Sequence, residues 1–333
     1  MLAIGARLLR ELVPMPLAIE LMKVVFAAYS EGRTISPLRL PIQMPDGSGV
    51  TLYMPAYVPA TSAAPSASGA KVVSVFGDNP ARSLPTINAM VVTVDPATGV
   101  PVGLIEGATL TALRTGAVSG AATDLLARPN ARTLAIIGAG AQGVTQAAAV
   151  CAVRQVRELR VFDVFPESAA SFKERLGSWD ADAAGVVVVA ASAEEAVTGA
   201  DIVCTATTST TPVFQHAWLA PGTHVNGVGA YTPEMQEIPA ATVAGARVVV
   251  DAVEAALHEA GDLIKPLNSG LISSEHVAVE LGHVVNNPDL GRRDNEEITF
   301  FKSVGNAIQD MIVAGAALQA AEQAGLGQPI DLR

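Results

Sequence analysis

A glycine-rich stretch near the middle of the chain has the residue types and spacing of a nucleotide-binding turn. Gly138, Gly140 and Gly143 follow an apolar run over 134–137, and a small-residue stretch that favours helix comes directly after them. In such a unit the first glycine allows the turn, the second admits a pyrophosphate and the third lets helix and strand pack closely. The helix start adds free N–H groups and a partial positive charge. We therefore expect a dinucleotide site here.

An acidic residue stands where such a site needs one. A second strand is expected over 158–162, and Asp163 follows it. This is about the spacing at which an acid binds the ribose hydroxyls of NAD. No arginine occurs in the next three residues, so a 2′-phosphate would meet a negative charge without a partner there. We predict a preference for NADH, with NADPH as the alternative.

Three cationic residues lie in segments that are otherwise apolar, namely Arg39, Lys71 and Arg114. Buried lysine and arginine are rare unless they are paired. Each of these residues alone is also compatible with a snorkelling surface side chain or with one half of an ion pair. If the three converged they would bind a carboxylate, because arginine offers a planar fork and lysine a compact charge. Their spacing does not show whether they converge.

Other catalytic patterns do not occur in the sequence. The five histidines lack the H-E-x-x-H spacing, there is no G-x-S-x-G, and neither Cys151 nor Cys204 belongs to a C-x-x-C. We therefore expect no metal site. Two cysteines give no disulfide framework and are typical of a reducing cytosol.

The charge of the chain limits its partners. Lys and Arg number 21 against 32 Asp and Glu, a net charge of -11, which argues against nucleic acid or an anionic membrane surface. A long uncharged stretch, 133–153, contains the turn glycines and two glutamines, so it is unsuited to a membrane-spanning helix. The first ten residues lack the basic-then-apolar order and the small-residue cleavage site of a signal peptide. These features predict a cytoplasmic protein without a membrane segment.

The hydrophobic pattern predicts two kinds of sheet. The first region has the pattern of an antiparallel sheet with a helix, with strands over 37–44, 50–58, 70–76, 89–94 and 101–106 and helices over 16–31 and 109–127. The region after it has the alternation of a parallel, doubly wound sheet, with further strands over 186–190, 202–206, 224–228 and 247–251. The continuous apolar run over 186–190 suits a strand that is covered on both faces. A final helix is expected over 304–323.

Six motifs taken together resemble the ornithine cyclodeaminase and mu-crystallin family. They lie at Met54–Tyr57, Gly69–Val73, Leu84–Thr86, Thr111–Thr115, Gly138–Gln142 and Thr299–Gly305. The match runs nearly from end to end. It implies an α/β fold with a Rossmann domain, a doubly wound parallel sheet, over 115–304. It also implies a discontinuous α+β domain for substrate binding and dimerisation, made of 1–114 and a returning C-terminal helix over 305–333, a homodimer, and an active site in the cleft between the domains.

The resemblance also implies roles for particular residues. Arg39, Lys71 and Arg114 match the substrate-carboxylate contacts, and Thr86 matches a threonine beside them. The positions that match the cofactor turn and its acid are Gly138, Gly140, Ala141, Gln142, Gly143 and Asp163. Those that match the lining of the nicotinamide end are Thr205, Thr207, Val228, Ser303 and Val304.

Two departures from the family pattern bear on the reaction. Where the cyclodeaminases have a glutamate before the Met-Pro of the second strand, this chain has Leu52-Tyr53, and Tyr231 lies in the stretch where they have an aspartate. Both acids that would handle the amino groups of ornithine are missing. The remaining pocket is similar to that of family members that reduce cyclic imino acids.

We therefore expect an oxidoreductase, an NAD(P)H-dependent ketimine reductase. It would transfer a hydride to the imine carbon of Δ1-pyrroline-2-carboxylate or Δ1-piperideine-2-carboxylate and form L-proline or L-pipecolate. Tyr231, Thr86 or a water molecule could supply the proton, and the sequence does not choose among them. The alternatives are an ornithine cyclodeaminase, an amino-acid dehydrogenase similar to alanine dehydrogenase, and a ligand-binding protein similar to mu-crystallin.

Overall fold

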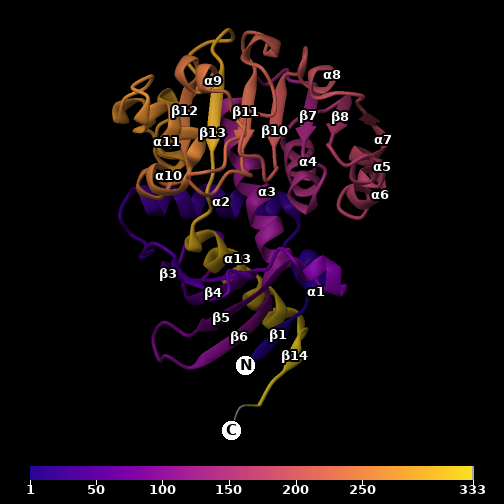
Figure 1. Ribbon diagram of the computed structural model, residues 1–333. Helices are drawn as coiled ribbons and strands as arrows, with labels where there is room; N and C mark the ends of the chain where they lie inside the picture. Colours follow the sequence, from indigo (N-terminus) through magenta and orange to yellow (C-terminus); the bar gives the residue numbers. More distant parts are fainter. Residues whose placement is uncertain (332–333) are drawn as a thin grey trace. The chain divides into compact units, whose positions relative to one another are not determined.

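The structure is a computed structural model that describes residues 1–331. By its internal contacts the chain divides into two compact units (Figure 1). The first unit comprises Met1–Arg114 together with the chain from Asn306 onward, and the second comprises Thr115–Gly305. The first unit is therefore built from both ends of the chain.

The first unit is a seven-stranded sheet with the order β14-β1-β6-β5-β4-β3-β2. Its strands are β1 (Leu2–Ile4), β2 (Leu40–Gln43), β3 (Val50–Val58), β4 (Ala67–Val75), β5 (Ile87–Val94), β6 (Pro101–Glu106) and β14 (Gln328–Pro329). Neighbouring strands are antiparallel except β1 and β6, which are parallel. Its helices are α1 (Ala6–Leu12), α2 (Met15–Ser30), the start of α3 (Gly107–Leu126) and α13 (Ala307–Ala324).

Helix α13 is the core of the first unit. It contacts α2 and the strands β3 to β5, so it is buried along almost its whole length. The Asn306 side chain accepts a hydrogen bond from the N–H of Ile308 at the helix start (3.1 Å), and Gly325 ends the helix in the left-handed region at φ 65°. Alternate residues of the strands face this helix, and in β4 these include Lys71 and Val73.

The second unit contains a parallel sheet with the order β12-β13-β11-β10-β7-β8-β9. Its strands are β7 (Thr133–Ile137), β8 (Glu158–Phe162), β9 (Val187–Val189), β10 (Ile202–Thr205), β11 (His224–Gly227), β12 (Arg247–Val250) and β13 (Thr299–Lys302). The chain runs from β7 toward β9 in one direction and from β10 toward β11 in the other. The order reverses between β7 and β10, the position at which such sheets bind nucleotides.

Short helices connect these strands, and Figure 1 shows them around the second sheet. They are α4 (Ala141–Val153), α5 (Pro166–Ala170), α6 (Phe172–Gly177), α7 (Ala181–Gly185), α8 (Ala193–Val197), α9 (Ala240–Gly245), α10 (Val253–Glu259), α11 (Gly261–Asn268) and α12 (Leu281–Asn286). Within residues 1–331 no single helix is both long and apolar enough to cross a bilayer, and only α1 and α2 pass such a test together, as a pair bent by 75°.

Several of the expected elements begin or end at other residues in the structure; the strand expected over 70–76, for example, is β4 at Ala67–Val75. The run over 186–190 is not covered on both faces, because β9 is the edge strand and pairs only with β8, which leaves Val188 and Val189 about half exposed. The strand expected from residue 37 begins only at Leu40, so Arg39 precedes β2. The last helix begins at Ala307 rather than at 304.

Candidate active site

The glycine turn has the geometry expected for each of its three glycines. Gly138 has φ +100°, and a Cβ there would lie 2.5 Å from the carbonyl oxygen of Ala206. A Cβ on Gly143 would lie 2.0 Å from the carbonyl oxygen of Gly138. In contrast, a Cβ on Gly140 would meet nothing within 4 Å. The first and third glycines are thus required by the fold, and the second leaves an open face at the start of α4.

Asp163 follows β8 and contacts this turn directly. Its Oδ2 accepts a hydrogen bond from the N–H of Ala139 (2.7 Å), and its Oδ1 accepts one from the N–H of Phe165 (2.9 Å). A carboxylate oxygen accepts more than one hydrogen bond, so both oxygens retain capacity for a ribose hydroxyl. The residue expected to bind the ribose therefore also holds the turn.

The residues expected at the nicotinamide end come from neighbouring strands. Main-chain hydrogen bonds continue past the carboxyl ends of the strands, from Ala206 to Ile137, from Val228 to Thr205 and from Ser303 to Gly227. Since β7, β10, β11 and β13 are adjacent and parallel, the segments after them lie along one edge of the sheet. The residues that this edge brings together are Thr205, Thr207, Val228, Ser303 and Val304.

A buried glutamate that the sequence analysis did not single out holds two of these segments. Glu237 accepts hydrogen bonds at Oε1 from the N–H (2.6 Å) and the hydroxyl (2.8 Å) of Thr207. Its Oε2 accepts from the N–H groups of Gly229 (2.6 Å) and Ala230 (3.0 Å). Burial raises the pKa of Glu237, and the nearby charge of Lys302 opposes this rise. One carboxylate thereby fixes the loops after β10 and β11.

Two buried aspartates hold the loops after β12 and β13. Asp251 Oδ2 accepts from the Ser303 hydroxyl (2.8 Å) and from the N–H groups of Val304 (2.9 Å) and Gly305 (2.7 Å). Asp262 Oδ2 pairs with Lys302 Nζ at 2.8 Å, and both side chains are fully buried. The Ser303 hydroxyl therefore donates its hydrogen bond to Asp251.

The edge also has the donors and acceptors that a dinucleotide needs. The Thr205 Oγ1 and the Gln142 Oε1 are buried and find no hydrogen-bond partner among the residues that the structure describes. Buried polar atoms of this kind are uncommon in folded proteins and need an explanation. The first N–H groups of α4 have no partner inside the helix, as at any helix start. Together with the open face of Gly140, these atoms fit a bound dinucleotide.

Two of the three expected carboxylate-binding cations form a buried cluster in the first unit. Lys71 and Arg114 are 1% and 6% exposed, and both contact Asp310 of α13, which is fully buried. The Lys71 Nζ lies 2.8 Å from Asp310 Oδ2, and the Arg114 Nε lies 3.1 Å from Asp310 Oδ1. Arg114 Nη1 also donates to Gln309 Oε1 at 2.7 Å. Two cations here share one carboxylate, so the cluster has one positive charge in excess when Lys71 is protonated.

The protonation of Lys71 reflects this setting. Burial lowers the pKa of Lys71 to about 7, the charge of Arg114 adds to the lowering, and Asp310 opposes it. The charge of Arg39 also lowers this pKa, so Arg39 acts on the same cluster although it precedes β2. Lys71 and Arg114 therefore converge on Asp310, which the spacing in the sequence could not show.

The two remaining candidates are less well defined. Thr86 is half-buried just before β5, and its carbonyl accepts a hydrogen bond from the N–H of Phe76 (2.9 Å). Tyr231 lies in the loop after β11 and is 38% exposed. The structure gives neither side chain a hydrogen bond within the described chain.

Sequence reasoning missed Asp310 and Glu237. Asp310 had a usable signal, because it is an acid followed directly by an uninterrupted apolar run over 311–318, and a buried acid needs a partner. Glu237 lies in a loop between a proline-containing turn and Pro239, and nothing in its neighbours marks it as buried.

Known proteins resemble this chain over its whole length. A model of the ornithine cyclodeaminase/mu-crystallin family matches residues 7–324. A Δ1-pyrroline-2-carboxylate reductase of Bacillus cereus is 40% identical over 99% of this chain and 100% of its own length.

Two solved structures extend the comparison. One is the Thermococcus litoralis Δ1-pyrroline-2-carboxylate reductase in complex with NADH and L-proline, with a TM-score of 0.92 and 38% identity over 99% of this chain and 100% of that one. The other is an archaeal alanine dehydrogenase dimer with bound NAD, with a TM-score of 0.90 and 31% identity over 100% of this chain and 99% of that one. Together with the family match, these likenesses confirm the resemblance drawn from the six motifs: the chain belongs to the ornithine cyclodeaminase/mu-crystallin family.

Proposed function

We propose that this protein reduces a cyclic imino acid, Δ1-pyrroline-2-carboxylate or its six-membered relative, to L-proline or L-pipecolate. The observation that carries the proposal is the buried Lys71–Asp310–Arg114 cluster with its excess positive charge. A buried positive charge without a counter-charge is unfavourable until an anion binds beside it. The carboxylate of an imino acid is such an anion, and relatives that share the fold and about two fifths of the residues carry this activity in their names.

The proposed roles follow from the chemistry. Reduction adds a hydride to the imine carbon and a proton to the ring nitrogen, and a bound NADH supplies the hydride. Arg114 and Lys71 hold the substrate carboxylate and Arg39 adds to the field that attracts it. Holding the carboxylate orients the ring, which is the main contribution of the protein to such a reaction. Thr86 or Tyr231 remains a candidate donor of the proton.

We assign the dinucleotide to the turn and to the edge of the parallel sheet. The turn residues Gly138 to Gly143 take the pyrophosphate, Asp163 takes the ribose, and Thr205, Thr207, Val228, Ser303 and Val304 line the nicotinamide end. Asp163 favours NADH, because a 2′-phosphate would be placed against its negative charge. Steady-state kinetics with both cofactors test this, and a clear preference for NADPH would contradict it.

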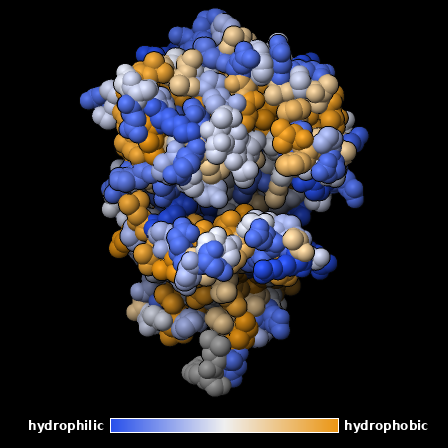
Figure 2. Space-filling model, viewed as in Figure 1, coloured by the Kyte–Doolittle hydropathy of each residue, from blue (hydrophilic) through white to orange (hydrophobic). Residues whose placement is uncertain are grey.

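We also propose a homodimer formed through the first sheet. The register places Leu40, Tyr53, Val72 and Met90 in one row across β2 to β5, on the face opposite α13. Leu40 is 60% exposed, Met90 49% and Tyr53 43%. Exposed apolar surface of this extent is typical of an interface. Figure 2 shows hydrophobic residues at the surface of this unit, in the lower half of the view.

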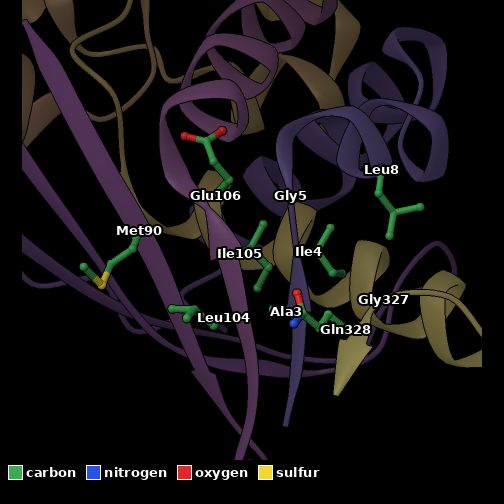
Figure 3. Close-up of a pocket in the computed structure, with 10 residues that line it drawn as sticks. All are labelled: Ala3, Ile4, Gly5, Leu8, Met90, Leu104, Ile105, Glu106, Gly327 and Gln328. Carbon is green, nitrogen blue, oxygen red and sulfur yellow. The ribbon is translucent and has the colours of Figure 1, made fainter. Parts of the chain in front are cut away.

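A recess at the β1 end of the same sheet continues this surface. It has a volume of about 570 Å³, and Met90 and Leu104 form part of its wall beside Ala3 and Gln328 (Figure 3). A sheet face of this kind can pair with the same face of a second copy about a twofold axis. The recess is then filled by side chains of the second copy.

One set of assays tests the proposed reaction. The absorbance of reduced cofactor is followed with Δ1-pyrroline-2-carboxylate, with Δ1-piperideine-2-carboxylate, and with pyruvate plus ammonia, and ornithine is tested with NAD. We expect turnover of a cyclic imine and none of ornithine, because neither Leu52 nor Tyr231 offers an acid to a second ammonium group. Turnover of pyruvate and ammonia alone would favour an alanine dehydrogenase. Binding without any turnover would favour a ligand-binding protein.

A further inference from the structure

Arg175 of α6 contacts the glycine turn although it is far from it in the sequence. Its Nη2 donates hydrogen bonds to the carbonyl oxygens of Ala139 and Ser168, the latter at 2.8 Å. The guanidinium carbon lies 6.0 Å from the ring centroid of Phe172, which is fully buried. Arg175 therefore ties the turn after β7 to the segment after β8.

The residue between the first two glycines is consequently held on both sides. The N–H of Ala139 donates to Asp163 at 2.7 Å, and its carbonyl oxygen accepts from Arg175. In a trans peptide the carbonyl and the following N–H point in opposite directions, and the described chain has no cis peptide bond. The N–H of Gly140 therefore points away from Arg175. Gly140 is also the glycine whose Cβ position is open.

Stability alone does not account for this arrangement. The Arg175 Nε is buried and has no hydrogen-bond partner among the described residues. A guanidinium that loses water without replacing all its hydrogen bonds is unfavourable. What the contact does provide is a fixed direction for the Ala139–Gly140 peptide.

We propose that Arg175 is a positioning residue for the cofactor, which holds the glycine turn in its dinucleotide-binding shape before the cofactor arrives. The inference rests on the proposed use of NADH. Its ligand class is the pyrophosphate of a dinucleotide, met by the N–H groups of Gly140 and of the first turn of α4. Because the turn is already ordered, cofactor binding does not pay the entropic cost of ordering it. The affinity for the cofactor is therefore higher.

The test compares Arg175→Met, Arg175→Lys and a matched control, Arg160→Met. Arg160 lies in the same unit and also donates to a main-chain carbonyl, that of Thr198 at 2.7 Å, away from the turn. NADH and NADPH affinities are measured by fluorescence titration of the full-length protein. Hydrogen exchange of the segment 138–143 is measured without cofactor.

We expect Arg175→Met to raise the Kd for NADH about tenfold, since a charge-assisted contact is worth about one to two factors of ten. Exchange over 138–143 should accelerate in the protein without cofactor, and Arg175→Lys should restore part of both properties. Arg160→Met should leave the Kd within about twofold.

Three outcomes would overturn the proposal. An unchanged Kd in Arg175→Met with lower thermal stability would make Arg175 a structural brace only. A Kd for NADPH that rises much more than that for NADH would mean a direct contact with the 2′-phosphate. Failure of the unmodified protein to bind either cofactor would instead reject the proposed function, and the role of Arg175 with it.

Discussion

Asp310 sets the charge of the candidate substrate site, because it is the acid that Lys71 and Arg114 share. With this carboxylate in place, two buried cations leave a single excess charge. Without it, Lys71 and Arg114 would repel each other in a buried setting, where charges interact strongly. The chain thus tolerates two buried cations at the proposed substrate site.

Replacing Arg114 by alanine should cripple turnover and spare cofactor binding. The variant loses a charge-assisted contact worth about 1.5 to 3 kcal/mol, and about 1.36 kcal/mol corresponds to a factor of ten. We expect kcat/KM for the imine to fall by about ten- to a few hundredfold. The Kd for NADH should change little, because the turn lies in the other unit. Near-normal turnover would remove Arg114 from the site.

Binding of L-proline should weaken above neutral pH. The pKa of Lys71 is lowered to about 7, so its ammonium is charged below this pH and neutral above it. If the charged form binds the carboxylate, the Kd of L-proline with cofactor present should rise with pH above about 7, by at most tenfold per unit. Titration calorimetry between about pH 6 and pH 9 measures this Kd on both sides of the Lys71 pKa. Lys71→Arg should remove the dependence, and a flat profile in the unmodified protein would contradict it.

The chemical role of single residues could be predicted from the sequence, but the residues that they contact could not. The glycines and the cations could be found because their types are unusual for their surroundings. Asp310 and Glu237 act through contacts with residues that are distant in the chain, and Lys71 and Asp310 are separated by most of the sequence. Local patterns do not contain such pairings. The convergence of Lys71 and Arg114 on Asp310 needed the fold for the same reason.

At the scale of elements, Glu237 joins the loops after β10 and β11, and its amide variant should loosen both. Glu237→Gln replaces one acceptor oxygen by an NH₂ group, which then faces N–H donors. Leaving buried donors without an acceptor costs about 1 to 3 kcal/mol each. We expect the free energy of unfolding to fall by about 3 kcal/mol in urea titrations. Glu254→Gln, at an exposed position of α10, is the control. Equal stability of the two variants would mean that Glu237 does not hold the two loops together.

Two strands whose ends are marked by turn residues could be predicted to the residue. The expected ranges 50–58 and 101–106 coincide with β3 and β6. The apolar run at β9 was misread because its composition is that of a buried strand, while its exposure depends on its place at the sheet edge. The strand β13 was noticed only as a motif, and its position between β11 and β12 depends on a long-range pairing. Sheet order is set by such pairings and not by local pattern.

At the scale of the whole molecule, charges on the exposed sheet face should separate the proposed dimer. Leu40→Lys and Met90→Lys place like charges near each other across a twofold interface, where such pairs cost several kcal/mol. We expect a dimer at micromolar concentration for the unmodified protein and monomers for the double variant, by light scattering after gel filtration. Leu271→Lys, at an exposed position of the second unit, should leave the dimer intact. A monomeric unmodified protein would reject the interface.

The return of the chain to the first unit has a consequence for synthesis. A nascent chain that has not yet reached Asn306 has made all strands of the first sheet except β14, but not the helix that covers them. Lys71 then lacks Asp310, and the inward faces of β3 to β5 lack α13. The second unit is meanwhile complete in sequence and can fold ahead of the first, so the unit with the glycine turn precedes the unit with the Lys71–Asp310–Arg114 cluster on the ribosome. A message truncated shortly before residue 306 would therefore yield a protein that retains the cofactor turn and has no finished substrate cluster.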